Sequence, residues 1–181
     1  GIIRRAFPPR ERQPTEQIAM EIAEKRLGLL TSYDFHLLTA LTPEDEAVAV
    51  ASGVYLDGVN AGFVTYLAVH PNQRGSGVGG SLRAALIQAF QDDARRSDWP
   101  DLAAVVGEVR AESPWLRHLV KDPDVLPLEL NYFHPGEDPS DPDTEWVLYR
   151  QAISDFRTEL PALEVRQLLF AIWRRAYRVR W

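Results

Sequence analysis

The stretch VTYLAVHPNQRGSGVGG, residues 64–80, decides the fold of this chain. An apolar, strand-like run leads through a proline turn into a loop in which four of the six residues from Gly75 to Gly80 are glycine. An apolar helical pattern follows at 81–94. A strand, a glycine-rich loop and a helix N-terminus form a general anion-binding device, because backbone N–H groups converge there and the helix dipole adds positive charge. The loop is therefore expected to hold an anion.

Strand and helix patterns flank this loop on both sides. We expect strands at 2–6, 35–41, 47–56, 61–69, 102–109, 126–133 and 145–151, and helices at 15–27, 81–94 and 113–120. The three strands between 35 and 69 are joined by short turns, which predicts an antiparallel meander. The acidic, proline-rich segment at 134–144 predicts a surface loop.

The C-terminal stretch carries apolar residues at helical spacing and predicts an extra helix at about 155–180. We expect its apolar stripe to pack against the domain, with a dimer contact as the alternative. Four arginines lie near its end, namely Arg174, Arg175, Arg178 and Arg180. We interpret them as cations that complement the helix dipole rather than as a binding patch.

Composition narrows the class of protein. At 181 residues and 45% hydrophobic content, the chain is expected to form one domain over 1–181, with a core at 2–151. The net charge of −6 gives no electrostatic footprint for nucleic acid or an anionic membrane. The absence of cysteine excludes disulfides, zinc-thiolate sites and thiol nucleophiles, and we expect no metal site. No run reaches the length of about 18 apolar residues that a membrane span needs, so we expect a cytoplasmic protein. We also expect it to be a monomer or a homodimer.

Two familiar phosphate-binding loops do not fit residues 75–82. A P-loop requires lysine and then serine or threonine after its last glycine, but Ser81 and Leu82 follow Gly80. The dinucleotide fingerprint G-x-G-x-x-G is met by Gly75, Gly77 and Gly80, yet that loop should follow its strand at once within an alternating β-α-β pattern. Here HPNQR intervenes and a meander precedes the loop. We interpret this match as a coincidence of glycine density.

A third frame starts at Arg74 and reads R-G-S-G-V-G, which fits [QR]-x-x-G-x-[GA]. With YLAVHP before it and an apolar helix after it, it closely resembles the acyl-CoA pyrophosphate loop of the GNAT superfamily of N-acetyltransferases. The order of expected elements is similar to the whole GNAT domain over roughly 2–150. The resemblance implies an α/β (α+β) fold with a mixed, mostly antiparallel central sheet flanked by helices.

The resemblance also implies an acetyl-CoA site. The backbone of Leu67, Ala68 and Val69 would pair with the pantetheine amides where that strand splays from the next one. The backbone amides of the loop would hold the pyrophosphate at the start of the following helix. The loop residues concerned are Arg74, Gly75, Ser76, Gly77, Val78, Gly79 and Gly80.

Acetyl transfer to an amine requires a base, because a lysine-like amine is mostly charged at neutral pH. The strand that ends at the loop, FVTYLAV, has no carboxylate. Glu108 in GEVRAES is the candidate base, since that stretch resembles LEVR-x-S-N of ribosomal-protein N-terminal acetyltransferases, where the matching glutamate is the base. The alternative for Glu108 is a polar residue on the solvent side of a strand.

The general acid of many relatives is a tyrosine in the helix after that strand, and SPWLRHLVKDPD has none. Tyr132 is a candidate substitute, with His118 as a further one, while His70 is interpreted as structural. Trp115, Trp146, Tyr132 and Phe133 are candidates for an acceptor pocket, although aromatic residues in strands more often lie in the core.

The function expected from this resemblance is transfer of an acetyl group from acetyl-CoA to a primary amine of a small molecule or peptide, by direct attack on the thioester. The alternative is a catalytically silent GNAT-fold module that binds acyl-CoA as a sensor or interaction domain. The loop fits both functions, and the missing tyrosine and strand carboxylate keep the second function open as an alternative.

Overall fold

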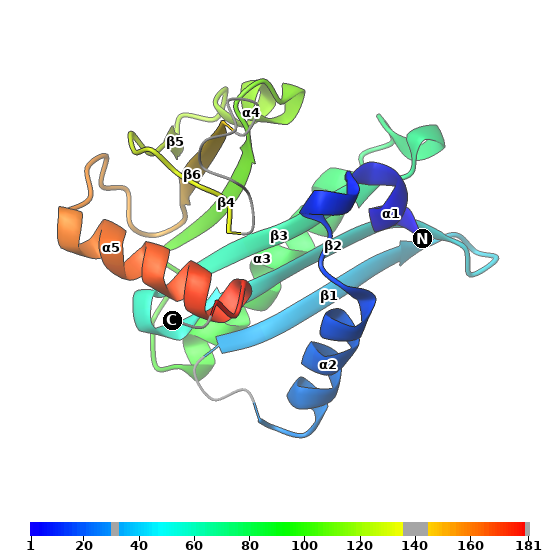
Figure 1. Cartoon of the computed structure of the whole chain (residues 1–181), viewed down its shortest axis with the longest axis horizontal. Helices are drawn as coiled ribbons and strands as arrows, with labels where there is room; N and C mark the ends of the chain where they lie inside the picture. The colour runs from blue at the N-terminus through cyan, green and yellow to red at the C-terminus, as the bar shows by residue number, and fades with distance from the viewer. Residues whose placement is uncertain (30–32, 136–144, 180–181) are drawn as a thin grey trace.

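The structure is a computed structural model that describes residues 1–29, 33–135 and 145–179. Within these residues a six-stranded sheet has the order β1-β2-β3-β4-β6-β5 (Figure 1). All neighbouring strands are antiparallel except β3 and β4, which are parallel. The strands are β1 (Tyr33–Leu41), β2 (Ala47–Leu56), β3 (Ala61–Val69), β4 (Ala104–Arg110), β5 (Val125–Pro127) and β6 (Trp146–Ala152). This sheet confirms the expected mixed, mostly antiparallel architecture.

Helices cover both faces of the sheet. Figure 1 shows α3 behind the strands and α1, α2 and α5 in front of them. The α-helices are α1 (Ile2–Ala6), α2 (Thr15–Arg26), α3 (Val78–Arg96), α4 (Pro114–Leu119) and α5 (Ala162–Ala171). Short turns of helix are η1 (Pro9–Glu11), η2 (Asp57–Val59) and η3 (Pro71–Gln73), and a π-helical turn, η4 (Ile172–Ala176), continues α5.

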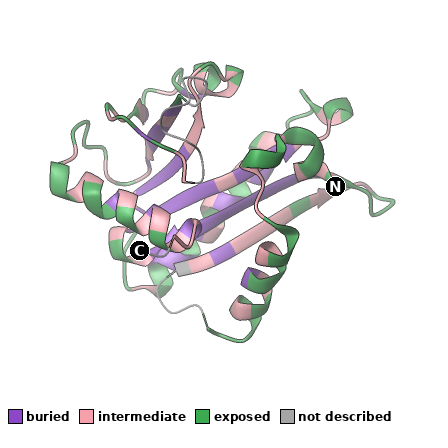
Figure 2. Ribbon diagram, viewed as in Figure 1, coloured by how far each residue is buried: buried purple, intermediate pink, exposed green. Residues whose placement is uncertain are grey.

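Two large clusters of buried side chains form the core, one on each face of the sheet, and a smaller third cluster lies around Leu119, Val125 and Tyr149. Under α3, the ring of Phe90 packs so closely on the strands that a Cβ at Gly62 would lie 2.0 Å from it. On the other face, Leu168 and Ile172 pack with Phe63 and Val106. The central strands are accordingly the most buried part of the sheet (Figure 2). The C-terminal apolar stripe therefore packs against its own domain.

The meander and the helices on either side of it agree with the sequence. The strands at 47–56 and 61–69 have the expected bounds, and the helix expected at 15–27 is α2. Ser113 caps α4 as expected, since its Oγ accepts the Trp115 N–H at 3.2 Å. Most of the proline-rich segment at 134–144 lies outside the described residues.

Three predicted elements were wrong. Ile2–Ala6 is a short helix rather than a strand, because it packs across β2 and β3 instead of joining a sheet edge, and strand propensity depends on such context. The strand expected at 126–133 is limited to β5. The N–H of Leu128 still donates to the Leu148 carbonyl at 2.8 Å, but the N–H of Leu130 then donates back to the Leu128 carbonyl at 2.9 Å, and this tight turn takes the chain away from β6. Tyr132 forms only an isolated bridge with Trp146. The helix expected from about 155 begins at Ala162, directly after Pro161.

Arg178 also differs from the expectation. It lies beyond the last helical turn with φ at 54°, and its guanidinium pairs with Glu21 and Glu24 of α2 at 3.2 and 2.5 Å. It therefore joins the C-terminal segment to α2 instead of complementing a helix dipole.

The pairing of β3 with β4 ends halfway along both strands. The ladder runs from Ala61 opposite Ala104 to Val64 opposite Gly107. Beyond this point β3 stays with β2, while β4 turns away with β6 and β5 (Figure 1). The sheet is therefore open between Thr65–Val69 and Glu108–Arg110. No helix among the described residues is long and apolar enough to cross a membrane.

Candidate functional site

The glycine loop lies at one side of this opening and leads into α3. Its backbone is left-handed at two glycines, with φ of 83° at Gly75 and 87° at Gly77, and Gly77 is the N-cap of α3. Side chains rarely adopt this conformation, so glycine is required there by the backbone itself. The loop is fastened to its own turn, since the Oγ of Ser76 donates to the Gln73 carbonyl at 2.7 Å.

Five backbone N–H groups of the loop are available to a ligand. In the described part of the chain, no protein acceptor takes a hydrogen bond from the N–H groups of Gly75, Gly77, Val78, Gly79 or Gly80. The last three belong to the first turn of a 19-residue helix, where N–H groups have no intrahelical partner and the dipole is positive. The loop thus offers donors suited to a phosphate group.

The predicted pantetheine strand borders the same opening. Leu67, Ala68 and Val69 pair with β2 on one edge, opposite Ala51, Val50 and Ala49. Within the described residues no strand pairs with the other edge of β3 beyond Val64. An extended ligand with amide groups would find unpaired backbone there.

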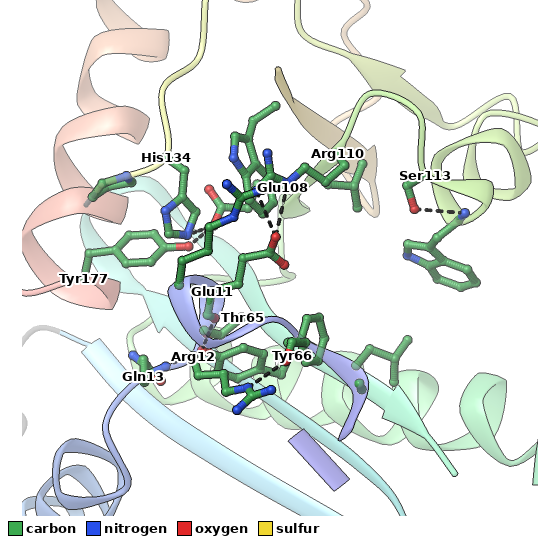
Figure 3. A pocket seen from close by; sticks show the side chains of 18 of the residues that line it. Glu11, Arg12, Gln13, Thr65, Tyr66, Glu108, Arg110, Ser113, His134 and Tyr177 are labelled. Carbon is green, nitrogen blue, oxygen red and sulfur yellow. Dashed lines mark hydrogen bonds and ion pairs between the residues drawn. The ribbon is translucent and has the colours of Figure 1, made fainter. Parts of the chain in front are cut away.

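A cavity of about 430 Å³ occupies the opening on the side of the N-terminal segment. Its lining comes from β3, β4, η1, the start of β6 and the C-terminal segment (Figure 3). Carboxylates, arginines and aromatic rings share this lining, among them Glu11, Glu108, Arg110, Trp115, Trp146 and Tyr177. The cavity is large enough for a small molecule or for the end of a peptide.

Glu108 lies at the inner end of the cavity, with only 6% of its side chain exposed. The hydroxyl of Tyr132 donates to its Oε2 at 2.5 Å, and the hydroxyl of Tyr177 donates to its Oε1. The Nε2 of His134 lies 3.2 Å from the same Oε1 (Figure 3). A carboxylate accepts about four hydrogen bonds, so these three partners leave room for one more donor. Glu108 is thus a hydrogen-bonded carboxylate that lines a pocket, not a residue on the solvent side of a strand.

The N-terminal segment closes the cavity through an ion pair. Glu11 Oε1 lies 2.9 Å from Arg110 Nη2, and both side chains are nearly buried. The guanidinium of Arg110 also lies 4.5 Å above the ring of Trp146. The hydroxyl of Tyr66 on β3 donates to the Glu11 carbonyl at 2.8 Å, and burial raises the pKa of Tyr66. The wall formed by residues 7–14 is therefore fixed to both strands of the opening.

The remaining sequence candidates fall into two groups. Trp115 and Trp146 line the cavity, whereas Tyr132 and Phe133 do not. Tyr132 is 4% exposed, and burial together with the charge of Glu108 raises its pKa. Its role as an acid stays a prediction, with its hydroxyl directed to Glu108.

The two histidine candidates lie away from Glu108. His118 is exposed and stacks on Trp115 at 5.2 Å. The Nδ1 of His70 accepts the Asn72 N–H at 3.4 Å, so His70 caps the turn before the loop. The structural interpretation of His70 agrees with this contact.

Sequence reasoning missed four residues of the site: Glu11, Arg110, His134 and Tyr177. Glu11, His134 and Tyr177 are distant in sequence from the strand and loop motifs that identified the other residues. Arg110 could have been noted, because it lies two positions after Glu108 and so projects to the same side of the strand.

Comparisons with known proteins agree with the observed fold. The model of the acetyltransferase (GNAT) family matches residues 3–105. No curated protein matches the chain. A protein from Bacteroides thetaiotaomicron assigned to the GNAT acetyltransferases is similar in structure, with a TM-score of 0.62 and 14% identity over 99% of this chain and 89% of that chain.

Two further solved structures share the fold. The Escherichia coli ribosomal-protein alanine N-acetyltransferase has a TM-score of 0.57 and 18% identity over 88% of each chain. A PaiA N-acetyltransferase from Thermoplasma acidophilum, solved in complex with coenzyme A, has a TM-score of 0.54 and 10% identity over 76% of this chain and 70% of that chain.

Proposed function

This chain belongs to the GNAT family of acetyltransferases, and on that basis we propose that it transfers an acetyl group from acetyl-CoA to a primary amine of a small molecule or peptide. The observation that carries the proposal is the opening between β3 and β4. It has unpaired anion-binding amides on one side and a pocket with a held carboxylate on the other. Bound acetyl-CoA would supply the thioester that the amine attacks directly.

The residues proposed to hold acetyl-CoA are those of β3 and the loop. Leu67, Ala68 and Val69 would pair with the amides of pantetheine, and Arg74–Gly80 would hold the pyrophosphate. The left-handed glycines support this assignment, because they direct backbone N–H groups outward without side chains between them and a ligand.

Glu108 is the proposed base. An amine that enters the 430 Å³ cavity can reach it only from the open side, since Tyr132, Tyr177 and His134 occupy the others. Glu108 would accept a proton from the ammonium group, directly or through one water, and so produce the neutral nucleophile. Tyr132 remains a candidate for the acid that protonates the departing thiolate, although its hydroxyl is directed to Glu108.

The aromatic wall supports an amine acceptor of moderate size. Trp115, Trp146 and Phe7 line the cavity and provide shape with few rotatable bonds. The charges of the nearly buried Glu11–Arg110 pair cancel. Arg10 and Arg12 also line the cavity, so the ammonium group of the acceptor would be attracted by Glu108 at short range only.

The test is release of free thiol from acetyl-CoA in the presence of a panel of primary amines, comparing the wild-type chain with Glu108→Gln. We expect release with at least one amine, and loss of about 10²- to 10⁴-fold in the variant at neutral pH. Binding of acetyl-CoA, measured by calorimetry, should stay nearly unchanged.

The opposite outcome would be binding of acetyl-CoA without thiol release for any amine. That result would support the second candidate, a silent acyl-CoA-binding module. No binding of acetyl-CoA at all would contradict both functions.

A further inference from the structure

The C-terminal segment makes an unusual turn just before it reaches the site. In η4 the N–H of Tyr177 donates to the carbonyl of Ile172 at 3.2 Å, five residues earlier. In an α-helix, a residue five positions on would face roughly 140° away. In the π turn it returns above Ile172, which is fully buried. The turn therefore directs Tyr177 to the sheet, and such turns are frequent at functional sites.

The side chain of Tyr177 reaches Glu108 from this position. Its hydroxyl donates to Glu108 Oε1, and its ring lies edge-on to Phe63 at 5.9 Å and to His134 at 5.0 Å. Unlike Tyr132, it forms part of the cavity lining (Figure 3). Of the two tyrosine hydroxyls bonded to Glu108, that of Tyr177 is therefore the one on the cavity side.

The next residue fixes the segment in place. Arg178 pairs with Glu21, whose side chain is 1% exposed, and with Glu24. Burial raises the pKa of Glu21, and the charge of Arg178 opposes that rise. A buried carboxylate destabilises the folded state unless a cation lies beside it. The ion pair with α2 therefore keeps the C-terminal segment in its place. The π turn before Tyr177 and the ion pairs of Arg178 after it therefore fix the position of Tyr177.

We propose that Tyr177 is a positioning residue for acetyl transfer, and that the C-terminal segment completes the active site through it. The inference rests on the proposed function, with Glu108 as base. The tyrosine hydroxyl would keep Oε1 oriented, so that the remaining acceptor position of Glu108 faces the amine. The segment lies beyond residues 3–105, which the family model matches.

The test compares Tyr177→Phe with Tyr55→Phe. The control also removes a buried hydroxyl, which donates to Asn60 at 3.1 Å, but it packs in the cluster under α3. We expect Tyr177→Phe to lower kcat by roughly 10- to 100-fold, as for loss of a hydrogen bond to a charged group. KM for acetyl-CoA should stay unchanged, and Tyr55→Phe should keep the wild-type kcat.

The pH profile separates positioning from a structural role. A carboxylate that loses a donor to its ionised form is protonated more readily. The acidic limb of the pH–rate profile should therefore move to higher pH in Tyr177→Phe and stay in place in Tyr55→Phe. Carbon-13 NMR of the Glu108 carboxyl should show the same displacement of its titration midpoint without any acceptor present.

The outcomes distinguish this inference from the proposed function. Thiol release by the wild type with an unchanged kcat and acidic limb in Tyr177→Phe would overturn the inference alone. The same NMR midpoint for the Glu108 carboxyl in the wild type and in Tyr177→Phe would also overturn it. If the wild type binds acetyl-CoA but releases no thiol with any amine, the proposed function fails and the inference fails with it.

Discussion

Replacing Gly77 by alanine tests the left-handed backbone of the glycine loop separately from the proposed role of the loop in binding acetyl-CoA. The φ of Gly77 is 87°, and an added Cβ would meet nothing within 4 Å. The cost of the substitution is therefore conformational rather than steric, and a left-handed non-glycine residue costs about 1–2 kcal/mol. For a domain of this length, that corresponds to a fall in Tm of roughly 2–8 °C.

Gly80→Ala is the matched control. Gly80 also has open space around its Cβ, but it lies inside α3 with no positive φ. Alanine in a helix is more stable than glycine by roughly 0.5–1 kcal/mol, so this variant should melt slightly above the wild type. The two substitutions add the same methyl group three residues apart and should shift Tm in opposite directions.

The ligand arm of the experiment tests the loop as an acetyl-CoA site. At 100 times its Kd, a ligand that binds only the folded state adds about 2.7 kcal/mol, or roughly 5–11 °C in Tm. We expect this shift for the wild type with acetyl-CoA, a much smaller one with NADH or ATP, and none for Gly77→Val. If Gly77→Ala melts no lower than Gly80→Ala, the left-handed backbone assignment is refuted. A full shift in Gly77→Val would refute the pyrophosphate site.

Three further predictions concern the base, the last helix and an acidic side chain. Glu108→Gln should flatten the acidic limb of kcat/KM against pH, and an unchanged profile would exclude it as the base. Truncation after Gln151 removes Leu168, which is 5% exposed, with other buried side chains worth about 1.5–3 kcal/mol each, so the cooperative melt should be lost; an unaltered melt would contradict this. A hydrogen bond from Arg157 lowers the pKa of Asp155 to about 2. The ionised Asp155 therefore stabilises the fold fully above the unfolded pKa near 3.8, and this contribution is lost as the pH falls through about 2. Asp155→Asn should then cost about 1 kcal/mol at neutral pH after screening and nothing below pH 2, as urea melts at several pH values would show.

The strands and helices around the loop could be predicted because their signals are local. The apolar runs at 47–56 and 61–69 and the helical apolar pattern at 81–94 each lie within a single element. The runs are typical of strands buried on both faces, and the helical pattern indicates one buried face. The glycine spacing likewise depends on neighbouring residues alone, and it identified the loop in which the structure has Gly75 and Gly77 left-handed.

The errors arose where the sequence alone does not determine the partner of a segment. Ile2–Ala6 has a strand-like composition, yet it packs across the sheet as a helix. The apolar residues at 126–133 looked like one strand, but a tight turn between Leu128 and Leu130 takes the chain away from β6. In both cases tertiary context outweighed propensity.

By itself the sequence determined the sheet meander, the glycine loop at the start of α3 and Glu108 as a candidate, because each of these depends on residues that are adjacent along the chain. Only the tertiary structure decided how Glu108 is held. Tyr177 lies 69 residues further on, and its contact depends on a π turn and on an ion pair with α2. No periodicity in the sequence predicts that turn, because packing against the sheet decides whether the last helical turn is α or π.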